Sequence, residues 1–364
     1  MAEWCWKESG ITSGLPQTIK SQLGSIPFDQ FSRQYIAWRI VERMRPDMDN
    51  KSHLKILDIG GYGGKTREFF PEDEVTVLDL YDIDEPCYVK GDALDMPFAD
   101  DAFDVAVSFD VLEHIPREKR RQFIQESTRV SQHLNLIAAP FYSKKAAQTE
   151  FALNHYYKNL TGFPHQWLQE HIDYGLPVST DIEKYLTEND LYFSAVNSNE
   201  IHNWTWIQFA VLFTASSNVS SQYLEQLYQF YNTHLSSLED YDENSYRRVY
   251  IASPRELPQD LDREFQNNYS WEDRLRLKEI TFQHIAQMQQ NAQREMVNHE
   301  LNWYQLMVER LNRENKHLHY LLAMRDNELQ LINQSRGWRI IRFLRRFRSG
   351  LWGKLAFKKG KHEG

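Results

Sequence analysis

The chain has 364 residues and a mass of 43.4 kDa, so we expect a core domain with additions rather than one minimal domain. Hydrophobic residues make up 41% of the chain and charged residues 26%, which excludes a disordered or collagen-like protein. The net charge of -9 is unevenly divided, because residues 335–364 hold ten Lys or Arg and one acid. The other 334 residues hold 32 basic and 50 acidic residues, so this part of the chain is not expected to bind nucleic acid.

The cysteines and the hydropathy predict where the protein is found. Cys5 and Cys87 are too few for a disulfide framework, and the first thirty residues lack the pattern of a signal peptide. The sequence has no run of eighteen apolar residues, so no transmembrane helix is expected. These features predict a protein of the reducing cytoplasm.

The hydrophobic pattern up to residue 256 predicts an α/β domain. Apolar residues at helical spacing over 28–45 predict an amphipathic helix that covers the core and stops before Pro46. Short apolar runs separated by helical or polar stretches predict buried parallel strands in a doubly wound sheet. These runs are 54–59, 75–80, 87–89, 103–109 and 134–139. Three later runs, 191–196, 206–213 and 246–252, are read as strands that can close the sheet antiparallel.

The region after Pro258 predicts a long helix, because no proline follows and the next glycine is Gly337. A helix over 271–334 would be about 95 Å long, so we expect it to project or to oligomerise. Its apolar residues approach a heptad pattern, which favours a coiled coil and a homo-oligomer over a solvated helix rich in Gln and Asn. They are Trp303, Met307, Leu311, Leu318, Leu322 and Leu329.

A glycine-rich turn after the first strand carries the strongest chemical signal. Glycines there let a backbone approach a ligand, and three ligand classes compete for this turn. A dinucleotide fingerprint fits poorly, because its last glycine position is Thr66. A phosphate-binding P-loop fails by one residue, because its first glycine position is Ile59. The third class is methyl transfer.

Residues 58–64, Asp-Ile-Gly-Gly-Tyr-Gly-Gly, resemble motif I of the class I S-adenosylmethionine-dependent methyltransferases. The resemblance continues through three further segments in family-like order up to residue 140. It implies a Rossmann-like sheet of seven strands with helices on both faces, and S-adenosylmethionine as the cofactor. Tyr62 occupies the position of the middle glycine, which leaves a non-catalytic methyltransferase-like scaffold as an alternative.

The resemblance assigns cofactor binding to residues at the ends of the strands. A carboxylate at Asp79 would accept from the ribose hydroxyls, and Asp92 would contact the adenine amino group. Alternatively, Asp79 caps its strand and Asp92 forms a turn. The full set expected to bind the cofactor is Asp58, Gly60, Gly61, Tyr62, Gly63, Asp79, Leu80, Asp92, Ala93 and Phe109.

Two histidines are the candidates for a general base. Methyl transfer to a hydroxyl needs a base, and imidazole suits that task at neutral pH. We expect His171, and next His114, to serve, against the alternative of ordinary buried histidines. No Cys/His cluster has metal-binding spacing, so no metal is predicted, although His171 with Glu170 and Asp173 offers a divalent-ion alternative.

Residues 335–339 at the start of the tail resemble the Ser-x-x-Trp-Arg segment that often ends the coiled coils of bacterial surface-polysaccharide methyltransferases and glycosyltransferases. Residues 163–177 resemble a segment of bacterial methyltransferases associated with glycan modification. Beyond Trp338 the tail reads as a basic amphipathic helix, so we expect it to bind the anionic inner face of the cell membrane rather than a protein partner or nucleic acid. The acceptor implied is a sugar hydroxyl in surface polysaccharide or glycolipid biosynthesis. A small-molecule or protein acceptor stays open.

The predicted organisation therefore has four parts. Cover helices occupy 1–50 and the class I methyltransferase domain occupies 51–256, with an acceptor-side cap inserted at 142–190. The long helix or coiled coil covers 259–334. The basic tail covers 335–364.

Overall fold

The computed structural model describes residues 14–49, 52–216, 222–235, 244–261, 271–334 and 337. The chain divides into two units, Met1–Met296 and Val297–Gly364, and each is described by itself. Apart from Gly337, the basic tail that the sequence predicts to bind membranes lies outside the described residues, as does Cys5.

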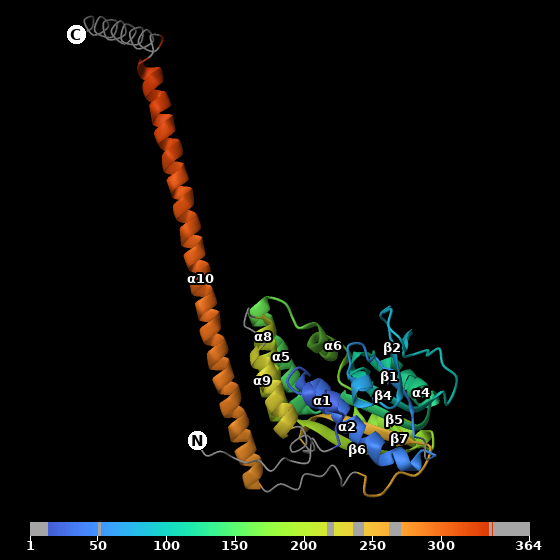
Figure 1. Cartoon of the computed structure of the whole chain (residues 1–364). Helices are drawn as coiled ribbons and strands as arrows, with labels where there is room; N and C mark the ends of the chain where they lie inside the picture. Colours follow the sequence, from blue (N-terminus) through green and yellow to red (C-terminus); the bar gives the residue numbers. More distant parts are fainter. Residues whose placement is uncertain are drawn as a thin grey trace, which may run out of the picture. The chain divides into compact units, whose positions relative to one another are not determined.

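A seven-stranded sheet forms the centre of the first unit (Figure 1). Its strands are β1 Lys55–Ile59, β2 Glu74–Asp79, β3 Tyr88–Lys90, β4 Phe103–Phe109, β5 Ser131–Pro140, β6 Tyr192–Glu200 and β7 Ser245–Ser253. The order is β3-β2-β1-β4-β5-β7-β6, with β1 to β5 parallel and β7 antiparallel to both of its neighbours. The predicted Rossmann-like sheet is confirmed.

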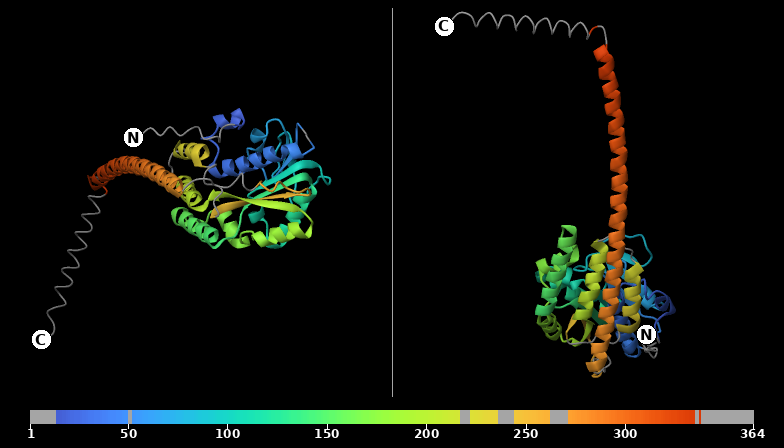
Figure 2. Two further views of the ribbon diagram at one scale, coloured as in Figure 1. Left: turned by 90° about the horizontal axis from the view of Figure 1, so that it is seen from below. Right: turned by 90° about the vertical axis from the view of Figure 1, so that its left-hand side faces the viewer.

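Helices cover both faces of this sheet, so every residue of β4 is buried (Figure 2). On one face lie α1 Gln17–Ser21, α2 Phe28–Met44 and α3 Thr66–Phe69, whose apolar residues share a core with the sheet. The helix predicted over 28–45 is α2, and the 3-10 turn η1 Arg45–Asp47 ends it at Pro46. The opposite face is covered by α4 Arg120–Arg129 and α7 Ser179–Glu188.

A second hydrophobic core lies beside the sheet and is built from the insertion after β5 and the region between β6 and β7. It is formed by α5 Lys144–Thr161, α6 Gln166–Tyr174, α8 Ile201–Ser216, α9 Gln222–Phe230 and the π-helical turn η4 Tyr231–Leu235. Helices α5, α8 and α9 lie side by side (Figures 1 and 2).

The prediction of a strand at 206–213 is wrong, because these residues lie inside α8. The buried residues of α8 recur at helical spacing, as Ile201, Trp204 and Ile207 show. A short, continuously apolar run looks alike in a buried strand and in a buried helix, and length decides between them. The 16 residues of α8 exceed the length of an ordinary strand.

Helix α10, Trp271–Gln334, has 64 residues and confirms the predicted long helix. In the second unit its large apolar side chains are exposed, including those of Trp303, Leu311, Leu318 and Leu322. Among the helices that the structure describes, none is both long enough and apolar enough to span a bilayer.

Candidate active site

The strand order reverses between β1 and β4, and ligands of open α/β sheets bind at the carboxyl ends of the strands that flank such a point. The glycine-rich turn follows β1. The 3-10 turns η2 Leu112–His114 and η3 Arg117–Lys119 follow β4. The two segments with the strongest sequence signals therefore share one edge of the sheet.

Two positions in the turn after β1 require glycine. Gly60 has a φ of +73°, and a Cβ there would lie 2.5 Å from the Cγ2 atom of Val111. A Cβ on Gly61 would lie 2.3 Å from the carboxyl carbon of Asp58. The turn thus packs against the loop after β4 and against Asp58, the acid next to the last residue of β1.

Tyr62 does not distort this turn. The left-handed positions of the loop are Gly60 and Gly63, and Tyr62 lies between them outside the left-handed region. The Tyr62 ring is 59% exposed and packs at 5.3 Å, centroid to centroid, against Tyr81. A side chain at the expected glycine position therefore needs no rearrangement of the backbone.

Asp58 organises the turn from inside. Its side chain is buried, and its Oδ2 atom accepts a hydrogen bond of 2.6 Å from the Thr66 hydroxyl. Its Oδ1 atom is buried and has no hydrogen-bond partner among the described residues. Burial raises the pKa of Asp58 to about 6, although the bond from Thr66 opposes the rise.

Asp79 is the last residue of β2, and its carboxylate joins the turn after β1 to the loop after β2 at the predicted cofactor edge. Its Oδ2 atom accepts from the backbone N–H of Tyr62 at 3.2 Å, and its Oδ1 atom accepts from the N–H of Leu80 at 2.7 Å. The Leu80 side chain itself is exposed. A carboxylate offers about four lone-pair positions, so Asp79 keeps capacity for a further donor.

The remaining predicted cofactor residues lie in a turn and in the core. The Oδ1 atom of Asp92 accepts from the Leu94 N–H at 2.9 Å, so this carboxylate does form the turn that the alternative reading expected. Ala93 packs against the core beneath it. Phe109 ends β4 and is buried in the core on the α2 side of the sheet.

The two candidate bases come together although 57 residues separate them in sequence. The Nε2 atoms of His114 in η2 and His171 in α6 are 3.4 Å apart. The Nδ1 atom of His114 is 2.9 Å from Glu170, and that of His171 is 2.8 Å from Glu150. Each imidazole is thereby oriented by its own carboxylate.

Burial and neighbouring charges shift the pKa values of this pair in opposite directions. Burial lowers the pKa of His114, and the charge on His171 lowers it further. Burial also acts to lower the pKa of His171, but the hydrogen bond with Glu150 and the charge on Glu113 outweigh it and raise the value overall. His114 is therefore the neutral member of the pair near pH 7.

Glu113 lies beside the pair and was missed by the sequence analysis. It is 0% exposed, and neither oxygen of its carboxylate has a hydrogen-bond partner among the described residues. Burial raises its pKa to about 8, with a smaller contribution from the charge on Asp110. The one sequence signal was an acid next to a candidate histidine at the end of β4, which did not reveal that the acid is buried.

Asp110 fixes the start of the loop after β4. Its backbone φ is +53°, and its carboxylate pairs with Arg33 of α2 and Arg247 of β7, each at 2.5 Å. Burial acts to raise the pKa of Asp110, but the charges on Arg247 and Arg33 outweigh it and hold the pKa well below its usual range.

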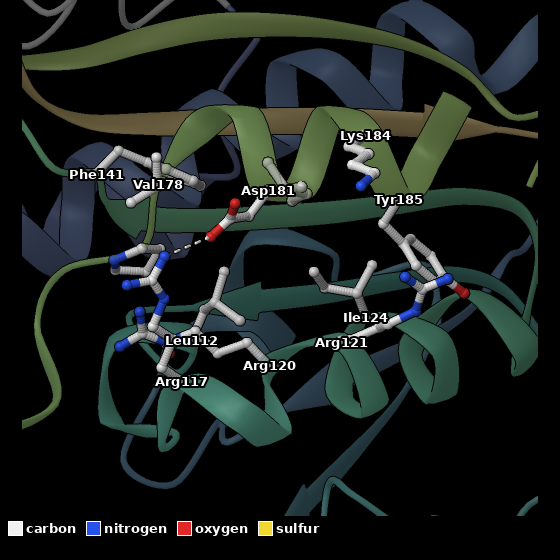
Figure 3. Close-up of a pocket in the computed structure, with 12 residues that line it drawn as sticks. Leu112, Arg117, Arg120, Arg121, Ile124, Phe141, Val178, Asp181, Lys184 and Tyr185 are labelled. Atoms are coloured by element: carbon white, nitrogen blue, oxygen red, sulfur yellow. Dashed lines mark hydrogen bonds and ion pairs between the residues drawn. The ribbon is translucent and has the colours of Figure 1, made fainter. Parts of the chain in front are cut away.

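Arg120 joins the segments that carry the two histidines. Its buried guanidinium donates to the carbonyls of Leu112 at 3.2 Å and Ile115 at 3.0 Å, which flank His114, and to the carbonyl of Gly175, which follows α6. Arg120 also lines a pocket of about 260 Å³ between α4 and α7, where Arg117 pairs with Asp181 at 3.5 Å (Figure 3).

Comparison with known proteins identifies one domain. Residues 64–134 match a family model described as a methyltransferase domain. A search of curated protein sequences finds no match.

Many solved structures resemble part of the chain. The YcgJ protein of Bacillus subtilis is 14% identical over 60% of this chain and 99% of its own, with a TM-score of 0.36. The magnesium protoporphyrin IX methyltransferase ChlM of Synechocystis PCC 6803, solved with bound SAH, is 14% identical over 62% of this chain and 84% of its own, with a TM-score of 0.36. The PH0226 protein of Pyrococcus horikoshii OT3 is 13% identical over 60% and 90%, with a TM-score of 0.35.

The residues at this edge fit the cofactor of such a domain. The buried, unpartnered Oδ1 atom of Asp58 and the spare acceptor capacity of Asp79 suit a ligand with hydroxyl and amine donors. Gly63 has open space where a side chain would stand, so the turn presents bare backbone on that side. The matched segment and the seven-stranded sheet show that this chain contains a methyltransferase domain, whose cofactor is S-adenosylmethionine.

Proposed function

We propose that this chain methylates a sugar hydroxyl in the biosynthesis of a bacterial surface polysaccharide or glycolipid. The observation that supports an oxygen acceptor is the histidine pair, in which two imidazoles, each oriented by a carboxylate, meet beside the cofactor edge. A hydroxyl needs its proton removed as it attacks, and imidazole is suited to that step.

Exposed aromatic side chains support a sugar as the bearer of that hydroxyl. They lie in the segment that follows β5 and carries His171, and Trp167 packs edge-on against His114 with ring centroids 5.2 Å apart. Rings of this kind offer an apolar face to the C–H face of a sugar while water stays close. The exposed aromatics of this segment are Tyr142, Phe151, Phe163, Trp167 and Tyr174.

The residues divide the work of the transfer. The bound cofactor supplies an electrophilic methyl group on its sulfonium. Asp79 and the glycine turn would hold its nucleoside, and the methyl group would pass to the acceptor oxygen while the sulfur kept the bonding electron pair. His114, the more exposed and neutral member of the pair, receives the acceptor proton, and Glu170 stabilises the charge that results.

A transfer assay with a methyl-labelled cofactor tests this proposal. Lipid-linked glycans of bacterial cell envelopes serve as acceptors, and mass spectrometry locates the new methyl group. His114→Asn is expected to lower kcat by about 100-fold or more while cofactor affinity, measured by calorimetry, stays unchanged. His155→Asn is the matched control, because His155 is exposed on α5. Methylation of protein or of small molecules, with glycans untouched, contradicts the sugar acceptor.

Two further parts of the proposal concern location and assembly. The exposed apolar residues of α10 and their near-heptad spacing support a homo-oligomeric coiled coil. The ten basic residues of the tail support binding to the anionic inner face of the cell membrane, where such glycans are assembled. The cytoplasmic enzyme would then meet its acceptor at that surface.

A further inference from the structure

Three electron-pair donors converge at the carboxyl end of β4. They are the Glu113 carboxylate and the imidazoles of His114 and His171, and one ligand atom of each lies within 4.8 Å of the other two. Neither Glu113 oxygen has a hydrogen-bond partner among the described residues, although the side chain is fully buried. A buried polar group without a partner costs about 1–3 kcal/mol, so the arrangement calls for a ligand.

The hydrogen bonds of the two imidazoles sharpen this requirement. A carboxylate only accepts, so Glu170 and Glu150 place a hydrogen on each Nδ1 atom and leave each neutral Nε2 atom with a lone pair. The two Nε2 lone pairs then face each other across 3.4 Å. Two acceptors at this distance repel, and either a proton shared between the two Nε2 atoms or a metal cation bound by both removes that repulsion.

We propose that Glu113, His114 and His171 bind a divalent transition-metal ion, and that Zn²⁺ suits the site best. Two imidazole nitrogens bound tetrahedrally at about 2.0–2.1 Å lie about 3.3 Å apart, close to the observed separation of 3.4 Å. The ion would draw in the Glu113 carboxylate. Imidazole ligands favour Zn²⁺ and its neighbours over Mg²⁺ and Ca²⁺, which prefer all-oxygen sites.

The surroundings support a prepared site. Histidine ligands of metals donate their second ring nitrogen to a carboxylate, which fixes the ring and raises its basicity. Here both histidines do so, and the Tyr246 hydroxyl in turn donates to Glu150 at 2.6 Å. The Arg120 guanidinium holds the ends of the segments that carry both imidazoles.

Three protein ligands leave one position open, as in catalytic zinc sites. This consequence rests on the proposed function: an acceptor hydroxyl at the open position would release its proton to water, and its oxygen would then attack the methyl group. The histidines would serve as ligands in that case, and the ion would replace imidazole as the activating group. Metal binding itself does not depend on the acceptor.

Zinc titration of the full-length protein, freed of metal by a chelator, tests the site. Calorimetry is expected to show one tight site in the wild type, lost or weakened at least 100-fold in Glu113→Gln and His171→Asn. His155→Asn is expected to bind as the wild type does. Tight binding that survives both ligand variants overturns the proposal, and so does the absence of any tight site in the wild type.

Two readouts separate this proposal from a folding defect and from the function above. Co²⁺ in place of Zn²⁺ is expected to give the visible ligand-field bands of a tetrahedral site, and those bands should vanish in Glu113→Gln. Glu113→Gln is expected to melt at or above the wild-type temperature without metal, because the amide removes an unpaired buried acid. Wild-type transfer that resists chelation would overturn the catalytic role of the ion and leave the methyl transfer intact.

Discussion

Asp58 shows how one residue makes stability depend on pH. Its pKa of about 6 in the folded protein lies above the ordinary value of 3.8, because the side chain is buried. The folded state therefore binds this proton more tightly than the unfolded state does. The contribution favours folding below about pH 4 and is lost as pH rises to about 6, by on the order of 3 kcal/mol.

Replacing Asp58 by Asn should remove this dependence, since the amide oxygen still accepts from Thr66 and does not titrate. Urea unfolding of both proteins from pH 4 to pH 7 measures the difference. The variant is expected to gain free energy of unfolding relative to the wild type as pH rises. A difference that stays constant with pH would contradict the burial argument.

Asp79 should control cofactor affinity. Asp79→Asn removes one acceptor from the group assigned to the ribose hydroxyls, so calorimetry is expected to show affinity for S-adenosylmethionine reduced by about 10- to 100-fold. Asp82→Asn is the control, because Asp82 lies on the same loop, exposed and paired with Lys90. Binding of ATP, without binding of S-adenosylmethionine, would contradict this assignment and favour the alternative that the glycine-rich turn is a phosphate-binding P-loop.

At the scale of elements, Arg120 connects the turn after β4 to the end of α6. Arg120→Met leaves the carbonyls of Leu112, Ile115 and Gly175 without their donor. We expect a loss of about 3 kcal/mol in the free energy of unfolding. Arg121→Met, whose side chain is exposed and paired with Glu188, should cost less than about 1 kcal/mol in the same urea titration.

The exposed, near-heptad apolar residues of α10 (the apolar stripe, which includes Trp303, Leu311, Leu318 and Leu322) should determine the number of chains in the oligomer. Leu311→Gln combined with Leu318→Gln is expected to reduce the mass measured by light scattering to that of one chain, because these residues supply the heptad contacts. Glu309→Gln combined with Lys316→Gln changes exposed positions outside the stripe and should leave the mass unchanged. Equal masses for the wild type and both double variants would contradict the prediction that α10 forms a coiled coil.

Local patterns predicted the strands, α2 and α10, because the spacing of apolar residues and the absence of Pro and Gly are visible in the sequence itself. The sequence placed β4 at its observed residues and α10 from Trp271 to Gln334. It failed at α8, where apolar residues on all sides hide the helical period. Such a pattern identifies burial without identifying the element that is buried.

The candidate site was only partly predictable for a different reason. His114 and His171 stood out as titratable residues, but their separation of 3.4 Å depends on the packing of α6 against η2. The burial of Glu113 and the pairing of His171 with Glu150 are likewise tertiary facts. A single sequence carries the residue types of the site and not their distances.

At the scale of the whole molecule, the charge asymmetry predicts a membrane contact. A chain lacking residues 335–364 loses a net charge of +9. It is expected to stay in the supernatant when anionic vesicles are sedimented, whereas the full chain pellets with them at low salt. Neutral vesicles are the control, and equal partition of both proteins would contradict the tail's role.

The pairing of Asp110 with Arg33 and Arg247 also has a consequence in time. Arg33 precedes Asp110 by 77 residues and Arg247 follows it by 137, so a chain emerging from the ribosome holds one partner long before the other exists. His171 is likewise synthesised 57 residues after His114. A nascent chain therefore completes the glycine-rich turn after β1 early, whereas Asp110 gains its second arginine partner only when β7 has been synthesised, so a product that ends before β7 has the turn but lacks Arg247.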